Sequence, residues 1–165
     1  MVAVLADRAL YSFYDDEPSP DLAELEARYA RQARGRSLDG TQDWHNWILR
    51  ELASGEAAGF VQATVGQGDV ELAWVVGTAY QGRGYATEAA RAVLDAFLGG
   101  RLGVRTNVVM AHIAPGHRAS ETVAARLGLH PTDESVDGET RWVLVVEAPP
   151  EDDPSAVSRR RETSA

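Results

Sequence analysis

The part of this chain that is most informative about chemistry is residues 81–86, which read Gln81-Gly82-Arg83-Gly84-Tyr85-Ala86. Two glycines separated by one residue let the backbone turn tightly, so that successive N–H groups can point to one place. A helix that begins directly after this turn adds unpaired N–H groups and the positive end of its dipole. The segment therefore predicts an anion site suited to phosphate, with Arg83 as a mobile cation and Ala86 allowing close approach.

The residue types and spacing of this loop argue against two other phosphate-binding motifs. A Walker loop requires Gly-Lys-Ser/Thr, but all 16 basic residues of this chain are Arg. A dinucleotide-binding fingerprint needs a third Gly or Ala three residues after the second glycine, where this chain has Thr87. A Gly-rich turn that only caps a helix stays open on spacing alone, because such turns are common.

Composition restricts the class of protein. The chain has 165 residues, a net charge of −9 and no cysteine. The length suits one domain, and the acidic balance argues against nucleic-acid binding. The absence of cysteine excludes disulfides and thiolate chemistry, and no His/Asp/Glu set has metal-ligand spacing. No apolar run approaches the roughly 20 residues that span a bilayer, and no signal peptide is evident, so we expect a cytoplasmic protein without a membrane partner.

The elements before the loop follow from periodicity. Apolar residues near Leu5 and Leu10 predict a short helical piece, and Ser19-Pro20-Asp21 predicts the start of a helix that Gly35 ends. Residues 44–49, 60–65 and 70–76 read as three strands separated by turns. We expect these strands to form an antiparallel meander.

The elements after the loop are a helix, a strand, a helix and a last strand. Residues 86–97 carry an apolar helical stripe that Gly99-Gly100 ends, and residues 107–113 read as a strand covered on both faces. Residues 118–127 predict a helix and 141–146 the last strand. The fold class is α/β (α+β): one mixed sheet with helices packed on it, in a single domain of residues 1–147, followed by a disordered tail of residues 148–165.

Two motifs together resemble a known family. Residues 81–86 match the Gln/Arg-x-x-Gly-x-Gly/Ala loop of the GNAT superfamily of N-acetyltransferases. Downstream, Pro115-Gly116-His117-Arg118-Ala119-Ser120, then Val123-Ala124 and Gly128-Leu129, is similar to the family's second signature. The version found in ribosomal-protein N-terminal acetyltransferases is the most similar one. The resemblance covers roughly residues 44–146.

The resemblance implies a mostly antiparallel sheet with helices on both faces, splayed where acetyl-CoA binds as cosubstrate. The loop's N–H groups would hold the pyrophosphate, and the pantetheine arm would pair with the strand of residues 71–76. A backbone N–H near Trp74 and Val75 would polarise the acetyl carbonyl. The implied cofactor-binding residues are Trp74, Val75, Val76, Gln81, Gly82, Arg83, Gly84, Tyr85, Ala86, His117 and Ser120.

The chain departs from the family pattern at three places. His117 replaces the Asn of the second signature, and an imidazole can also donate a hydrogen bond. Ala124 occupies the position of a tyrosine general acid, which makes Ser120 the candidate near the departing sulfur; a helix-start Ser that bonds the backbone is the alternative. Only about nine residues precede Leu10, so the first edge strand of the family is expected to be missing.

Acetyl transfer to an amine needs a base that deprotonates the amine, and Glu71 is the best-placed carboxylate for this role. The alternative interpretation of Glu71 is a solvated residue of the strand. Residues 15–26 hold six carboxylates that would attract a cationic amine. One of Trp44 and Trp47 is expected in the core and the other near the acceptor.

The sequence thus predicts direct acetyl transfer to a primary amine, either a small molecule or a peptide N-terminus, with homodimerisation open. An acyl-CoA-binding module without turnover is the alternative.

Overall fold

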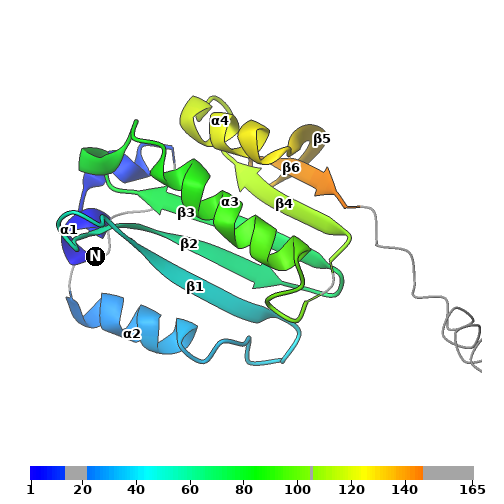
Figure 1. Ribbon diagram of the computed structural model, residues 1–165, viewed down its shortest axis with the longest axis horizontal. Coiled ribbons are helices and arrows are strands. Elements are labelled where there is room, and N and C mark those ends of the chain that lie inside the picture. The colour runs from blue at the N-terminus through cyan, green and yellow to red at the C-terminus, as the bar shows by residue number, and fades with distance from the viewer. Residues whose placement is uncertain (14–21, 105, 147–165) are drawn as a thin grey trace, which may run out of the picture.

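The computed structural model describes residues 1–13, 22–104 and 106–146 of the chain (Figure 1). Its centre is a six-stranded sheet in the order β1-β2-β3-β4-β6-β5. All neighbouring strands pair antiparallel except β3 and β4, which are parallel. The mixed, mostly antiparallel fold class is therefore confirmed. The predicted tail, residues 148–165, lies outside the described residues.

The first half of the chain contains short helices and the meander. The helical pieces are α1 (Val2–Leu5), the 3₁₀ turn η1 (Arg8–Tyr11) and α2 (Leu22–Gln32). The meander strands are β1 (Asp43–Arg50), β2 (Ala57–Val65) and β3 (Asp69–Val76). These elements agree with the periodicity, and Gly35 reverses the chain after α2 with a φ of +70°. Ser19, the expected N-cap of α2, lies outside the described residues.

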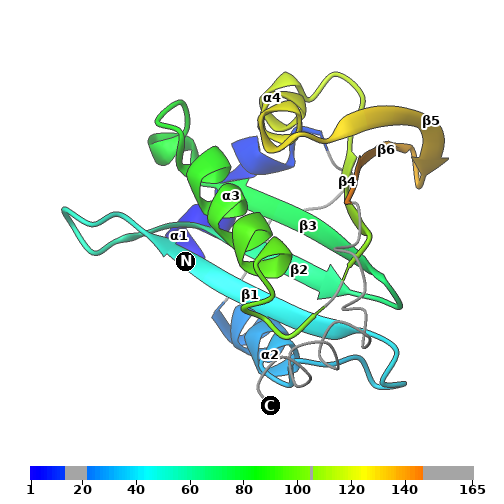
Figure 2. The same ribbon diagram turned by 45° about the vertical axis from the view of Figure 1, so that its right-hand side comes forward.

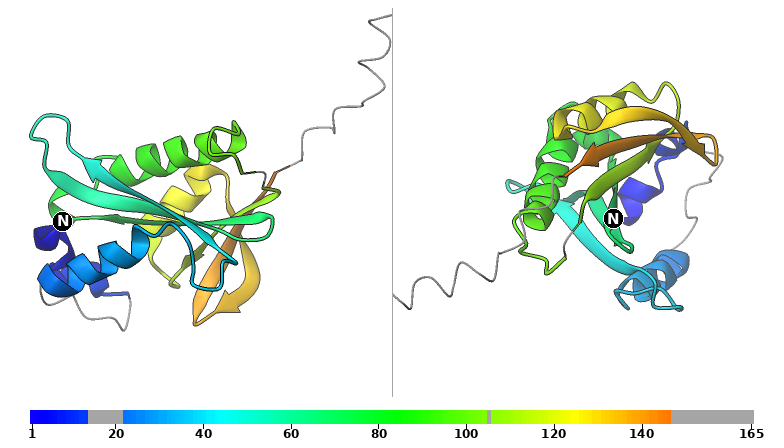
Figure 3. Two further views of the ribbon diagram at one scale, coloured as in Figure 1. Left: turned by 90° about the horizontal axis from the view of Figure 1, so that it is seen from below. Right: turned by 90° about the vertical axis from the view of Figure 1, so that its right-hand side faces the viewer.

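The second half begins with the 3₁₀ turn η2 (Thr78–Tyr80) and α3 (Tyr85–Leu98), followed by β4 (Val108–Ile113) and α4 (Arg118–Leu127). The α3 and α4 helices cover one face of the sheet and α2 lies against the other (Figures 2 and 3). Helices on both faces were expected. Strand alternation turns Val61, Leu72 and Val109 toward α3 and α4, where they form the main buried core with Leu94 and Leu127.

The last two strands correct the sequence analysis in one respect. A fifth strand, β5 (His130–Val136), precedes β6 (Glu139–Val145), and the two form a hairpin. The β5 sequence is polar and six of its seven residues are exposed, so it carries no alternating apolar pattern. The Asp137-Gly138 turn, with φ of 49° and 83°, is the signal that indicates this hairpin.

The strand β4 is also covered differently from the prediction. Val109, Ala111 and Ile113 are buried, but Val108, Met110 and His112 are only half-buried. The expectation of two fully covered faces was therefore wrong. The sequence of β4 is continuously apolar because Val108 and Met110 lie on the sheet face that the helices cover less densely.

The sheet opens between its two central strands. Only Asp69, Val70 and Glu71 of β3 pair with β4, opposite Val108, Val109 and Met110. From Leu72 to Val76, β3 pairs with β2 alone, so its other edge carries free backbone groups. The predicted splay is confirmed, and it begins after Glu71 rather than at the end of the strand.

The strand β1 forms one edge of the sheet. In the described residues no strand precedes β1. The Trp44 N–H donates to the carbonyl of Gly35 over 2.7 Å, and Arg36 forms a single bridge with Asp43. The turn after α2 thus covers the first part of this edge, which limits strand-to-strand association there.

Candidate active site

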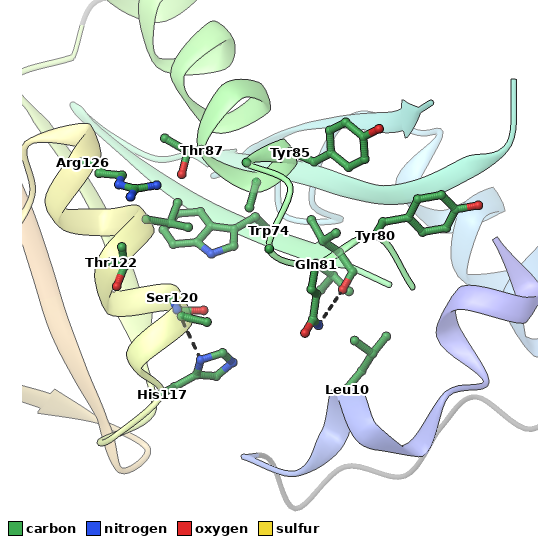
Figure 4. Close-up of a pocket in the computed structure, with 17 residues that line it drawn as sticks. Leu10, Trp74, Tyr80, Gln81, Tyr85, Thr87, His117, Ser120, Thr122 and Arg126 are labelled. Carbon is green, nitrogen blue, oxygen red and sulfur yellow. Dashed lines mark hydrogen bonds between the residues drawn. The ribbon is translucent and has the colours of Figure 1, made fainter. Parts of the chain in front are cut away.

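A cavity of about 440 Å³ lies at the open end of the sheet. Its walls come from the end of β3, the loop before α3, the first turn of α3 and one side of α4, with Leu10 of η1 opposite (Figure 4). All the predicted site residues except Glu71 and Arg83 line it: Trp74, Val75, Val76, Gln81, Gly82, Gly84, Tyr85, Ala86, His117 and Ser120. The fold therefore brings the two sequence motifs together.

The loop has the backbone geometry of an anion site. Gly82 and Gly84 have φ of 73° and 85°, and a Cβ added to either would meet no atom within 4 Å. The first helical bond of α3 runs from the Glu88 N–H to the Gly84 carbonyl. Within the described part of the chain, the N–H groups of Tyr85, Ala86 and Thr87 have no acceptor, as expected for a first helical turn. These donors face an open space suited to phosphate oxygens.

The Gln81 side chain joins this loop to the open edge of β3. Its Nε2 donates to the carbonyl of Val76 over 3.0 Å. The Gly77 N–H donates to Ala58 of β2, and backbone groups alternate in direction along a strand. The N–H and carbonyl of Val76 and Trp74 therefore point toward the open edge. Trp74 offers an N–H donor in the cavity, next to its own indole ring.

Arg83 is not the mobile cation that the sequence predicted. Its guanidinium forms an ion pair with Glu51 in the β1–β2 hairpin and lies 4.9 Å from the centre of the Tyr85 ring. Glu51 also accepts hydrogen bonds from Ser54 (2.8 Å) and Tyr85 (3.1 Å). The bonds from Ser54, Arg83 and Tyr85 lower the pKa of Glu51. Arg83 therefore fixes the loop from outside the cavity.

His117 and Ser120 lie at the start of α4. The Ser120 N–H donates to His117 Nδ1 over 3.3 Å, which makes His117 the N-cap of the helix, and the imidazole stacks on Phe13 at 4.3 Å. An accepting Nδ1 places the proton of the neutral ring on Nε2. His117 thus caps the helix and can also donate into the cavity that it lines.

Several cavity residues were not singled out in the sequence. Thr87 belongs to the first turn of α3, while Thr122 and Arg126 follow Ala119 and Ser120 at helical spacing on α4. That spacing is the signal that could have found them. Figure 4 shows Arg126 directed from α4 toward the first turn of α3. By contrast, Ala124 is fully buried in the core and does not line the cavity.

Glu71 lies on the other face of the sheet. It shares a strand face with Ala73 and Val75, away from α3, at the point where β3 and β4 separate. Its Oε1 is 2.8 Å from Nδ1 of His112 on β4. The carboxylate is therefore at the vertex of the opening rather than in the cavity.

Neither tryptophan of β1 lines the cavity. Trp47 packs against the core, as one of the pair was expected to, and Trp44 lies on the opposite strand face with its Nε1 near Gln42 (3.4 Å). Of the acidic cluster, Asp15, Asp16, Glu17 and Asp21 lie outside the described residues. Glu24 and Glu26 are exposed on α2.

Residues 1–13, 22–104 and 106–146 contain no group of three or more His, Cys, Asp or Glu side chains arranged for a metal ion. In the same residues no helix has the length and apolar character needed to cross a membrane.

Solved structures share this fold. A GNAT-family acetyltransferase from Bacillus anthracis superposes with a TM-score of 0.65 and 15% identity, covering 88% of this chain and 86% of that chain. The spermidine N-acetyltransferase from Vibrio cholerae, solved with CoA and spermine, gives 0.65 and 16%, with 87% and 86% covered. A putative ribosomal-protein-serine acetyltransferase from Vibrio cholerae gives 0.54 and 17%, with 75% and 72% covered.

Sequence comparison gives the family itself. The uncharacterised protein YkkB from Bacillus subtilis is 34% identical over 88 residues, which are 51% of this chain and 49% of that protein. The match thus spans about half the length of that curated relative. Residues 1–130 match the family described as "Acetyltransferase (GNAT) domain". This match covers most of the chain and both motifs, so the chain belongs to the GNAT acetyltransferase domain family.

Proposed function

We propose that this protein is an N-acetyltransferase that transfers an acetyl group directly from acetyl-CoA to a primary amine. The observation that carries the proposal is one cavity in which the glycine loop, the open edge of β3 and the start of α4 meet. The family match supports acetyl transfer, and the spermine complex of a protein with the same fold supports an amine acceptor. A peptide N-terminus is the other acceptor class, in keeping with the ribosomal-protein-serine acetyltransferase that shares the fold.

The cavity residues have distinct roles in this proposal. The N–H groups of Tyr85, Ala86 and Thr87 bind the pyrophosphate, and Arg126 adds a cation from α4. The free edge of β3 pairs with the pantetheine arm. The Trp74 N–H donates to the thioester carbonyl and stabilises the oxyanion that forms when the amine attacks. His117 Nε2 and the Ser120 hydroxyl are donors on the opposite wall.

The amine is deprotonated on one side of the opening, and the CoA thiolate is protonated on the other side. Glu71 takes the amine proton, directly or through water, before nitrogen attacks the carbonyl carbon. The tetrahedral intermediate then collapses and the C–S bond breaks, while the proton that the attacking nitrogen loses passes through the Ser120 hydroxyl to the departing thiolate. The sheet separates the two groups, so the amine approaches from the face that carries Glu71.

A second candidate function is an acyl-CoA-binding module without turnover. The observation that favours it is Ala124, which is fully buried where many family members have a tyrosine acid. The two functions share the loop and differ in what Glu71 and Ser120 do. A loss of turnover without loss of acetyl-CoA affinity in Glu71→Gln would distinguish an enzyme from a binding module.

The cofactor assignment is tested by a matched pair of glycine variants. Gly84 and Gly40 both have positive φ (85° and 72°) and open space around an added Cβ, but only Gly84 lines the cavity. A valine at either position strains the backbone similarly. We expect Gly84→Val to weaken CoA binding at least about tenfold, because side-chain atoms occupy the anion site. Gly40→Val should bind CoA as the parent does.

Isothermal titration calorimetry with CoA, acetyl-CoA and NAD measures these affinities, and circular dichroism checks the fold. CoA and acetyl-CoA should bind at micromolar levels and NAD should not. Unchanged CoA affinity in Gly84→Val, or an equal loss in Gly40→Val, would contradict the loop assignment.

A further inference from the structure

The opening of the sheet is bridged by one pair of side chains. Glu71 is the last β3 residue paired with β4, opposite Met110, and His112 lies two residues farther along β4 on the same face. The 2.8 Å contact between Glu71 Oε1 and His112 Nδ1 therefore joins the two diverging strands. In the described residues no other side-chain hydrogen bond links β3 to β4, so this pair defines the vertex of the opening.

The contact determines which atom donates the hydrogen bond and which atoms of the two side chains remain without a partner. A carboxylate can only accept, so the imidazole donates from Nδ1 and, when neutral, keeps a lone pair on Nε2. The side chain of His112 is 18% exposed and that of Glu71 is 40% exposed. The half-buried ring thus holds a more exposed carboxylate. The second oxygen, Oε2, has no protein partner among the described residues.

The cross-strand neighbour of His112 is a cation that has its own carboxylate partner. Arg141 is the cross-strand neighbour of His112 on β6, and its guanidinium forms an ion pair with Glu134 of β5. Arg141 is thus already neutralised by another carboxylate. His112 is the residue that is hydrogen-bonded to Glu71. It lies on β4, the strand that diverges from β3 at this point.

We propose that His112 is a positioning residue for acetyl transfer. It holds Oε1 of Glu71, so that Oε2 faces the acceptor side of the opening and accepts the amine proton. This inference rests on the proposed function and adds a residue that the sequence motifs do not contain. A base held in place by a second side chain keeps its geometry at no further entropic cost during the reaction.

The test uses five variants of the full chain. His112→Ala removes the donor, and His112→Asn keeps an N–H near the position of Nδ1. Glu71→Gln/His112→Ala, compared with Glu71→Gln alone, measures whether the two residues act as a unit. His130→Ala is the matched control, because His130 is exposed on β5 and has no side-chain partner among the described residues.

The readouts separate chemistry from binding. Free-thiol release from acetyl-CoA gives kcat, using the best acceptor among spermine, an aminoglycoside and a serine-initiated peptide, and calorimetry gives the Kd for acetyl-CoA. We expect His112→Ala to lower kcat about 10- to 100-fold, since small displacements of a catalytic group cost about this much. Its Kd should stay within about twofold. His112→Asn should recover most of the lost kcat, and His130→Ala should match the parent.

The double variant decides between positioning and general damage. If His112 acts through Glu71, removing it from Glu71→Gln should change kcat by less than about twofold. An equal loss of kcat with and without Glu71, or parental kcat in His112→Ala, would overturn the inference. Parental kcat in Glu71→Gln alone would overturn the proposed base. No thiol release with any acceptor would overturn the proposed function and this inference with it.

Discussion

Two arginines lie near the cavity, and their electrostatic surroundings differ. Arg83 is paired with Glu51 and stacked on Tyr85, outside the cavity. Arg126 lines the cavity, and in the described residues its guanidinium has no carboxylate partner. A cation that already has a carboxylate gains little from a phosphate, whereas an unpaired one gains a charge-assisted bond. Arg126 is therefore the residue whose charge should affect CoA binding.

This difference can be measured with a pair of identical substitutions. Arg126→Gln should raise the Kd for CoA about 10- to 100-fold, because a hydrogen bond to a charged group contributes about 1.5–3 kcal/mol. Arg83→Gln should change it by less than about threefold, apart from a small loosening of the loop. Calorimetry at low ionic strength is the measurement. A larger loss in Arg83→Gln than in Arg126→Gln would show that the guanidinium of Arg83 leaves Glu51 when the cosubstrate binds.

At the level of elements, the open end of β3 depends on how closely β2 supports it. Gly59 pairs with Val76, and a Cβ at position 59 would lie 2.1 Å from the Val75 carbonyl oxygen. That oxygen belongs to the backbone and cannot rotate away. The glycine therefore allows β2 and β3 to approach where β3 has lost its pairing with β4.

We expect Gly59→Ala to destabilise the fold by about 1–3 kcal/mol, as overpacking typically does, and to weaken CoA binding through the displaced β3. Gly66→Ala is the control. Its Cβ would meet the Asp69 carboxylate at 2.3 Å, but that side chain can turn to solvent. Chemical denaturation gives the two stabilities. Equal stability of Gly59→Ala and the parent would mean that the strand pair opens to accommodate a methyl group at little cost.

The same elements show which features the sequence can predict. The meander, α3 and α4 were predictable because their apolar periods are regular and glycines mark their ends. The polar strand β5 was missed because its pairing with β6, and not burial, makes it a strand. The contacts of Arg83 with Glu51 and of Glu71 with His112 join residues far apart in the sequence. Their register depends on strand pairing, which no local pattern specifies.

At the level of the whole molecule, the sheet separates two tasks. In the proposed mechanism the face under α3 and α4 carries the acetyl-CoA cavity, and the amine approaches the face that carries Glu71 and His112. The parallel pairing of β3 and β4 ends at Glu71, and the two strands diverge beyond it (Figure 2). Direct transfer needs such a passage, because the amine must reach the thioester without displacing the pantetheine arm.

A net charge of −9 should attract a cationic amine before any contact forms. If the acidic residues of segment 15–26 steer a cationic acceptor, Asp15→Asn/Asp16→Asn/Glu17→Gln should raise the KM for spermine at low salt and leave that for acetyl-CoA nearly unchanged. The control, Glu151→Gln/Asp152→Asn/Asp153→Asn, removes the same number of charges from the opposite end of the chain. If position matters and not only net charge, the control should have the smaller effect.

The salt dependence distinguishes steering from contact. Exposed charges act through water, so the effect should fade as the screening length falls from about 10 Å at 0.1 M to about 3 Å at 1 M. A direct ion pair with the amine would retain part of its contribution at high salt, because closely paired charges are screened less. Steady-state kinetics with spermine across this range is the measurement. Equal KM changes in the two triple variants would assign the attraction to the net charge of the molecule, and an unchanged KM at low salt would leave acceptor selection to contacts at the Glu71 face.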